Sequence, residues 1–235
     1  MTVAILPRDD AEVRVWATAL EVAALFVDVP WVLVGAQMVM LLEHEAGRLS
    51  GRTTGDVDAV VDVRALAGGT RAAAERLVAA GYEPASAEHP YRFIHGPASV
   101  DLLAPDHLGR HADLTTIPPA TTIAIPGGSR ALATRRTIEV DIIGVGSGAL
   151  PIPSLPGAIV LKVRAWHARH APRDAEDLVR LLSLVTDVEA VRGELKPGER
   201  QGLAQVAPLT DAANRAWRTV LDRDDAQAAF ARLAD

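Results

Sequence analysis

The sequence of 235 residues contains no cysteine and few aromatic side chains. Without cysteine, disulfides, thiolate metal sites and cysteine nucleophiles are excluded. Aromatic residues make up only 4% of the chain against 49% hydrophobic residues, so the core must be built mainly from Ala, Val, Leu and Ile. The length is sufficient for one large domain or for one domain with a helical extension.

Positive charge and long apolar segments are also scarce. A net charge of −6 and a pI near 5.6 argue against a protein that coats nucleic acid non-specifically, which would need a basic surface. No apolar run reaches the ~18 residues of a membrane span, and the first residues do not have the basic and apolar regions of a signal peptide. We therefore expect a cytoplasmic protein with no membrane partner.

Lysine is rare among the cationic residues. Only Lys162 and Lys196 are lysines, although Lys and Arg together number 24. A compact ammonium and a planar guanidinium bind anions differently, so a lysine kept in an arginine-preferring chain suggests a specific contact. Chance is the simpler alternative.

The apolar pattern of the first 105 residues predicts helices alternating with strands. The expected helices are 9–25, 36–45 and 69–80, and the expected strands are 31–35, 56–63, 91–95 and 99–103. The last two strands flank a Gly-Pro turn and predict a hairpin. This order is typical of an α/β (α+β) fold.

The second half of the chain has a different predicted secondary structure. Residues 117–143 predict irregular chain followed by one more strand, and the Gly- and Pro-rich stretch 144–157 predicts a linker. After it we expect only helices, at 156–169, 173–185, 197–206, 210–221 and 224–234. We therefore place a boundary near residue 150, between an α/β domain at 1–150 and a helical domain at 151–235.

Two aspartates stand one residue apart in the stretch RTTGDVDAVVD (52–62). Side chains alternate along a strand, so Asp56 and Asp58 point to the same side and repel each other unless a cation lies between them. Mg²⁺ is such a cation, because it binds one or two carboxylates together with substrate phosphates. The alternative is an ordinary solvated strand end.

The context of the aspartates favours the metal site. Gly35 lies at a strand-to-helix turn, where backbone amides and a helix N-terminus attract phosphate. Asp101 lies inside the apolar strand SVDLL, where a carboxylate is costly unless it is paired or binds metal. Three carboxylates facing a phosphate-binding turn are the parts of a two-metal phosphoryl-transfer site. Asp141, in IEVDIIG, is the rival for the third acid.

This arrangement resembles the nucleotidyltransferase fold of the DNA polymerase β-like superfamily. The matching segments, in order, are VGAQMVMLL, TTGDVDAVV and SVDLL. The resemblance implies a mixed sheet and two Mg²⁺ ions held by Asp56, Asp58 and Asp101.

The resemblance also implies a nucleotide side to the site. There the phosphates of an NTP would lie against Gly35, Ala36 and Thr54. Ala36 departs from the pattern, which has Ser or Gly at this position, so a hydroxyl contact to phosphate is lost and the backbone amide remains.

The helical half contains the informative stretch LKVRAWHARHAPRDAEDLVRLL (161–182). Lys162, Arg169 and Arg173 would share a face of one continuous helix. Pro172 predicts instead that the helix ends and a new one begins, with Asp174 in its first turn, where the helix dipole favours an acid. The alternative is an amphipathic helix with a solvated basic face.

The same stretch resembles the signature of the AbiEii/MenT type of nucleotidyltransferase toxins. The matching residues are Lys162, Ala165, Arg169, Arg173-Asp174 and Asp177-Leu178, and the whole resemblance covers 31 to about 182. It implies that Lys162 binds nucleotide phosphates, that Asp174 is an essential acid, and that Asp177 and Leu178 hold the helix in place. Arg169 and Arg173 would line the nucleotide or acceptor side of the site together with Asp174.

Together these resemblances predict an enzyme that moves a nucleoside monophosphate from an NTP to an acceptor hydroxyl. They imply a toxin of a toxin–antitoxin pair, with tRNA as the acceptor and a cognate antitoxin as partner. Two alternatives stay open: a nucleotidyltransferase acting on a small molecule or a protein, and a non-catalytic member that binds only nucleotide or a partner. The acidic pI favours the first alternative and Ala36 the second.

Overall fold

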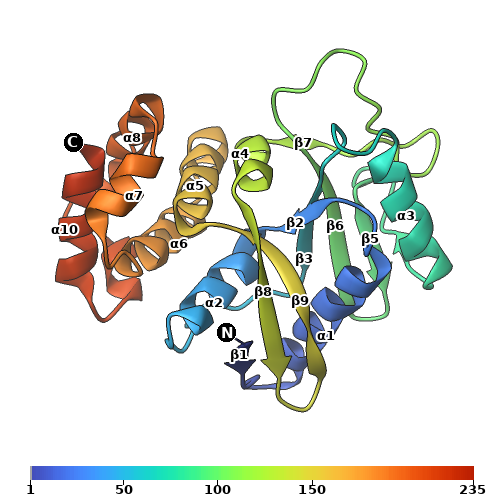
Figure 1. Cartoon of the computed structure of the whole chain (residues 1–235), viewed down its shortest axis with the longest axis horizontal. Coiled ribbons are helices and arrows are strands. Elements are labelled where there is room, and N and C mark those ends of the chain that lie inside the picture. Colours follow the sequence, from blue (N-terminus) through green and yellow to red (C-terminus); the bar gives the residue numbers. More distant parts are fainter. Residues whose placement is uncertain (1) are drawn as a thin grey trace.

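The computed structural model describes residues 2–235 and contains two β-sheets with helices around them (Figure 1). The strands are β1 (Thr2–Ile5), β2 (Trp31–Leu33), β3 (Val57–Val61), β4 (Glu83–Pro84), β5 (Arg92–His95), β6 (Ala98–Pro105), β7 (Ala124–Ile125), β8 (Arg135–Ile142) and β9 (Gly146–Pro153). The helices are α1 (Asp10–Leu25), α2 (Gly35–Glu45), α3 (Gly69–Ala79), α4 (Gly128–Ala133), α5 (Leu155–Arg169), α6 (Pro172–Ser183), α7 (Val188–Glu194), α8 (Pro197–Ala204), α9 (Ala207–Thr210) and α10 (Arg223–Ala234), with a 3₁₀ helix, η1, at Arg215–Thr219.

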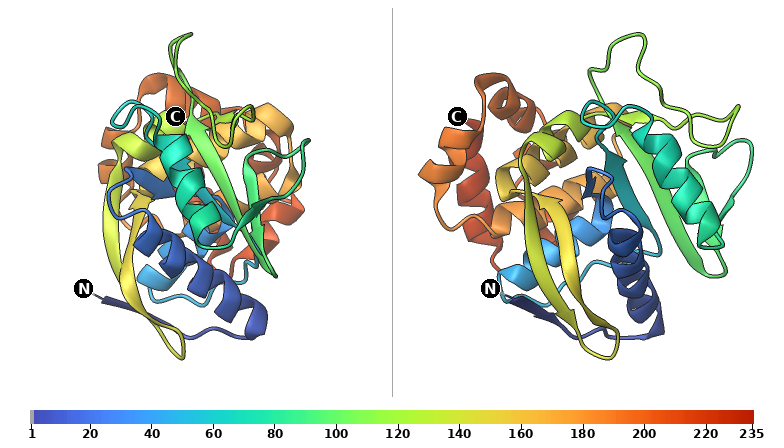
Figure 2. Two further views of the ribbon diagram at one scale, coloured as in Figure 1. Left: turned by 90° about the vertical axis from the view of Figure 1, so that its right-hand side faces the viewer. Right: turned by 45° about the vertical axis from the view of Figure 1, so that its right-hand side comes forward.

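The larger sheet is mixed, as predicted, and has the strand order β2-β3-β6-β5-β4, with β7 beside the end of β6. β3 and β6 are parallel, whereas β2 with β3 and β5 with β6 are antiparallel. Helices α1 and α3 pack against β3 and β6, and the views in Figure 2 place these two helices away from the C-terminal helices. The structure therefore confirms the mixed α/β class.

The smaller sheet has the order β1-β8-β9 and corrects the predicted linker. Most of the stretch expected to be a linker, 146–153, is strand β9, which pairs with β8 along its whole length. Pro151 and Pro153 cannot donate to a β-ladder, but β9 is an edge strand, so proline is tolerated there. The Gly and Pro residues of this segment therefore do not mark irregular chain, because the pairing with β8 makes it a strand.

The helical half also differs in detail from the prediction. No helix covers 210–221: the chain forms the short α9, then η1, whose first turn is capped by the Asn214 side chain. Helices α4 and α7 were not expected. The buried side chains form one hydrophobic cluster from Val3 to Leu233, which crosses residue 150, so the division into two domains stays a prediction.

The elements that carry the predicted motifs are where the sequence placed them. Helix α2 begins directly after β2, β5 and β6 form the expected hairpin, and α5 and α6 are separated just before Pro172. Within residues 2–235, none of the helices combines the length and the apolar composition that a membrane span requires.

Candidate active site

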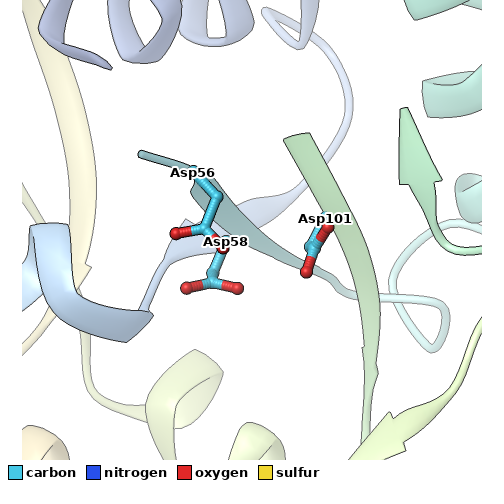
Figure 3. A group of neighbouring side chains, drawn as sticks. All are labelled: Asp56, Asp58 and Asp101. Atoms are coloured by element: carbon cyan, nitrogen blue, oxygen red, sulfur yellow. The ribbon is translucent and has the colours of Figure 1, made fainter. Parts of the chain in front are cut away.

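The neighbouring inner strands β3 and β6 of the larger sheet bring three carboxylates together (Figure 3). Asp58 and Asp101 are directly paired in the parallel register, and Asp56 lies one residue before β3. One carboxylate oxygen from each of the three residues lies within 4.8 Å of the others. The Asp101 side chain is only 8% exposed and that of Asp56 is 35% exposed, so the cluster reaches from the cavity into the sheet.

Gly35 is required at the turn that faces this cluster. Its φ of +69° lies in the left-handed region, and a Cβ there would lie 1.8 Å from Oδ2 of Asp58. Any side chain at this position would therefore displace Asp58. Because α2 begins at Gly35, the positive end of its dipole points at the acids.

The environment of Asp58 disfavours its charge. Burial, followed by the neighbouring charges of Asp56 and Asp101, raises the pKa of Asp58 from 3.8 to about 7, and Lys162 and Arg169 only partly offset this. A carboxylate held at such a pKa is a group that a bound cation would stabilise in its ionised form.

Arg92 is one of two site residues, with Arg52, that sequence reasoning missed. Its Nε and Nη2 donate to the two oxygens of Asp101, each at 2.7 Å, and Nη2 also lies 3.3 Å from Oδ2 of Asp56. The hydrogen bonds to Asp101 and the charges of both acids raise the pKa of Arg92. A signal was present, because Arg92 and Asp101 are opposite each other across the predicted hairpin.

Thr54 and Ala36 have different surroundings from those their family positions suggest. The hydroxyl of Thr54 donates to Oδ1 of Asp56 at 2.5 Å, so it orients a carboxylate. Ala36 is buried in the first turn of α2, with no hydroxyl to offer.

Helices α5 and α6 form the opposite wall and carry the second motif. Nζ of Lys162, which is buried, donates to Asp177 at 2.7 Å and lies 3.9 Å from Asp174. Arg169 makes two hydrogen bonds to Asp174, at 2.6 and 2.7 Å, and the pKa of Arg169 is raised by them. The predicted break between the helices is present, and Asp174 lies in the first turn of α6.

Asp177 does more than hold its helix. Besides Lys162, it accepts a hydrogen bond at 2.9 Å from Nε of Arg52, which lies in the loop before β3. Arg52 was not singled out from the sequence, although it begins the stretch that contains the two aspartates. The loop that carries Asp56 is thus tied to the helical half of the chain.

A cavity of about 700 Å³ separates the two walls. All ten residues predicted for the site line it: Gly35, Ala36, Thr54, Asp56, Asp58, Asp101, Lys162, Arg169, Arg173 and Asp174. Among residues 2–235, Arg173 has no carboxylate within ion-pair distance, and its side chain is exposed. An apolar recess of about 160 Å³ adjoins the cavity beside Gly35 and Lys162.

Asp141, the rival for the third acid, and Asp62, at the end of β3, lie outside the cluster. Asp141 lies on β8 in the smaller sheet and accepts a hydrogen bond from the Ser147 hydroxyl at 2.7 Å. Asp62 follows β3 and accepts from the backbone amides of Arg64 and Ala65, so it stabilises a turn. Neither belongs to the carboxylate cluster.

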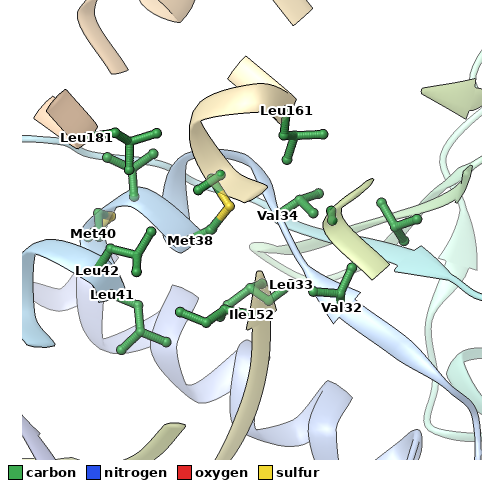
Figure 4. Packing of buried hydrophobic residues seen from close by; sticks show 14 of the residues in the cluster. Val32, Leu33, Val34, Met38, Met40, Leu41, Leu42, Ile152, Leu161 and Leu181 are labelled. Carbon is green, nitrogen blue, oxygen red and sulfur yellow. The ribbon is translucent and has the colours of Figure 1, made fainter. Parts of the chain in front are cut away.

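The core beneath the cavity fixes the two walls relative to each other (Figure 4). The labelled side chains come from β2, α2, β9, α5 and α6, and from Val34 between β2 and α2. Met38 of α2 is fully buried and Leu161 of α5 is 4% exposed. Because Gly35 begins α2 and Lys162 follows Leu161, packing of these helices positions both groups.

The acidic cluster fits a divalent cation. Three carboxylates offer the hard oxygen ligands that Mg²⁺ and Mn²⁺ prefer, within a distance that one ion can span. Asp58 has no ion-pair partner within residues 2–235, whereas Arg92 already binds both oxygens of Asp101. The most accessible ligands are therefore those of Asp56 and Asp58.

A mixed sheet that holds clustered aspartates beside a glycine turn, across a cavity from Lys162, is the arrangement of a nucleotidyltransferase. A family model described as nucleotidyl transferase AbiEii toxin, type IV TA system, matches residues 20–232. The chain therefore belongs to the AbiEii family of nucleotidyltransferase toxins, and it is a nucleotidyltransferase. A comparison with curated proteins gave no match.

The family match confirms and extends the predicted resemblance. The sequence motifs indicated a likeness from 31 to about 182, whereas the match runs to 232 and includes the C-terminal helices. Membership in a type IV toxin–antitoxin family implies an NTP substrate and an antitoxin partner.

Proposed function

We propose that this protein transfers a nucleoside monophosphate from an NTP to a hydroxyl at the 3′ end of tRNA, with Mg²⁺ as cofactor and release of pyrophosphate. The observation that carries the proposal is the cavity in which Asp56, Asp58 and Asp101 face Lys162 and Arg169. A phosphoryl-transfer site needs acids to hold metal and cations to hold phosphates, and here both line one space.

In this proposal the acids bind metal and orient the reacting groups. Asp56 and Asp58 hold Mg²⁺, which when bound neutralises charge that develops on the transferred phosphoryl oxygens. Thr54 fixes the rotamer of Asp56 through its 2.5 Å hydrogen bond. Gly35 leaves room for Asp58 and directs the N-terminus of α2 towards the phosphates. The superfamily resemblance implies two ions.

The cations of the other wall hold the triphosphate. Lys162 is buried against Asp177 and Asp174, which fix its ammonium group in the cavity wall. Arg169 is 62% exposed while its guanidinium is anchored to Asp174, so its remaining N–H groups face the cavity. Asp174 therefore acts by positioning both cations.

The tRNA acceptor is supported by the charges at the cavity wall. The exposed Arg173 has no ion-pair partner among the described residues, and Arg169 lies beside it. Guanidinium groups of this kind bind RNA phosphates. The net charge of −6 argues against non-specific coating of RNA, which is consistent with contact through a local group of arginines.

The test is incubation of the purified protein with Mg²⁺, total tRNA and each α-³²P-labelled NTP. We expect label in tRNA with the wild type and none with Asp56→Ala or Lys162→Ala. Lys196→Ala is the matched control, because Lys196 is the only other lysine and lies exposed before α8. Labelled protein or small molecule without labelled tRNA would contradict the acceptor, and absence of any transfer would contradict the enzyme assignment.

The toxin role has a separate test in cells. Induced expression of the wild type is expected to stop growth, and Asp56→Ala is expected to be harmless at equal protein level. Co-expression of the adjacent gene product should restore growth if that product is the antitoxin. Growth unaffected by an enzyme that is active in vitro would contradict the toxin role alone.

A further inference from the structure

We infer that Arg92 is a built-in cation of the acidic cluster, and that it limits the nucleotide-free protein to one divalent ion. Asp101 then serves as the anchor of Arg92, and Asp56 and Asp58 bind the exchangeable metal. This inference rests on the proposed metal-dependent function and specifies how many ions the protein itself holds.

The first observation is that Arg92 already binds both oxygens of Asp101. Both of its oxygens accept hydrogen bonds from Arg92 at 2.7 Å, and its side chain is only 8% exposed. A bidentate arginine–carboxylate pair is among the stronger hydrogen-bonded pairs in proteins. Each Asp101 oxygen keeps a second lone pair, but a metal bound there would lie close to the Arg92 guanidinium and be repelled by it.

The second observation is the charge balance of the three carboxylates and Arg92. The three carboxylates, when ionised, have three negative charges, and Arg92 contributes one positive charge within 3.3 Å of Asp56 and 2.7 Å of Asp101. The remaining formal charge of minus two is balanced by a single divalent ion. If catalysis uses two ions, the second must arrive with the phosphates of the NTP.

The position of Arg92 is set by the sheet. It lies on β5 directly opposite Asp101 on β6, and the next residue, Phe93, is fully buried on the other face. The Arg92 side chain is 37% exposed, but its strand is fixed by packing and by the β5–β6 ladder. Arg92 therefore approaches the cluster from a rigid element.

The first experiment counts ions with Mn²⁺, whose free form is quantified by electron paramagnetic resonance, in protein without nucleotide. We expect one Mn²⁺ per wild-type chain and two per Arg92→Met chain, because Asp101 then becomes a free ligand. Arg92→Lys retains the charge and should bind one. Arg173→Met is the matched control: it removes a positive charge from the same cavity and should leave the count at one.

A second variant keeps the inference testable if Arg92→Met does not fold. Asp101→Asn should still bind one ion with nearly wild-type affinity, because Asp101 is not a ligand in the inferred arrangement. Two ions on the wild type, or a large loss of affinity in Asp101→Asn, would overturn the inference. One ion on both the wild type and a folded Arg92→Met would overturn it too, whereas no ion on the wild type would contradict the proposed metal-dependent function itself.

Discussion

Replacing Asp58 with asparagine should stabilise the metal-free protein at alkaline pH while removing its activity. The pKa of Asp58 is raised in the folded state from 3.8 to about 7, so between these values the folded chain binds more protons than the unfolded chain. Stability therefore falls as pH rises through this window, and the whole penalty is present above about 7. Asparagine has no charge to repel Asp56 and Asp101, so the variant escapes this penalty.

The magnitude follows from the shift. A difference of roughly three pKa units, at ~1.36 kcal/mol each, sets an upper limit of ~4 kcal/mol. Because Asp58 is partly open to the cavity, solvent screening reduces this, and we expect about 2 kcal/mol. For a chain of this length that free energy corresponds to a rise in Tm of about 4–8 °C.

The assay is thermal unfolding of wild type and Asp58→Asn across a pH series with a chelator present. The Tm difference should grow between about pH 4 and pH 7 and then level off. Asp225→Asn, an exposed aspartate on α10, is the control and should show no such trend. A Tm difference that does not change with pH would refute the reasoning. Added Mg²⁺ should raise the Tm of the wild type but not that of Asp58→Asn.

Two further changes test the walls of the cavity. Gly35→Ala should abolish metal binding and destabilise the fold, because the new Cβ would lie 1.8 Å from Oδ2 of Asp58. The control is Gly47→Ala, at a similar φ of +72° but in open space, which should lower the free energy of unfolding by only about 1–2 kcal/mol and keep metal binding. Calorimetry measures both quantities. Lys162→Met removes one buried partner of Asp177, so the free energy of unfolding measured with denaturant should fall by up to about 3–5 kcal/mol, and NTP binding should be lost. Lys196→Met should change neither quantity.

Local patterns in the sequence were sufficient to predict the acid cluster. Strand alternation placed Asp56 and Asp58 on one face, and an aspartate inside an apolar strand identified Asp101. The break before Pro172 was predicted for the same kind of reason, because proline acts on its immediate neighbours.

The parts that were missed depend on pairing between distant segments. Arg52 and Asp177 are 125 residues apart, and no periodicity connects them. Strand β9 was read as a linker because its Gly and Pro residues signal irregular chain, and only its pairing with β8 at the edge of a sheet makes it a strand. Arg92 was recoverable in principle: the hairpin was predicted, and only its register, which pairs Arg92 with Asp101, was not.

The sharing of Asp177 between Lys162 and Arg52 has a consequence for how ligands enter. This carboxylate of α6 is 1% exposed and pairs both with Lys162 on the same wall and with Arg52 in the loop before β3, so drawing the walls apart would remove Arg52 from a buried acid. Removing a partner from a buried pair costs several kcal/mol, so the arrangement with the walls together is strongly favoured over an opened one. The cavity is therefore largely preformed, and a ligand is selected by how well it fits the opening that is already there.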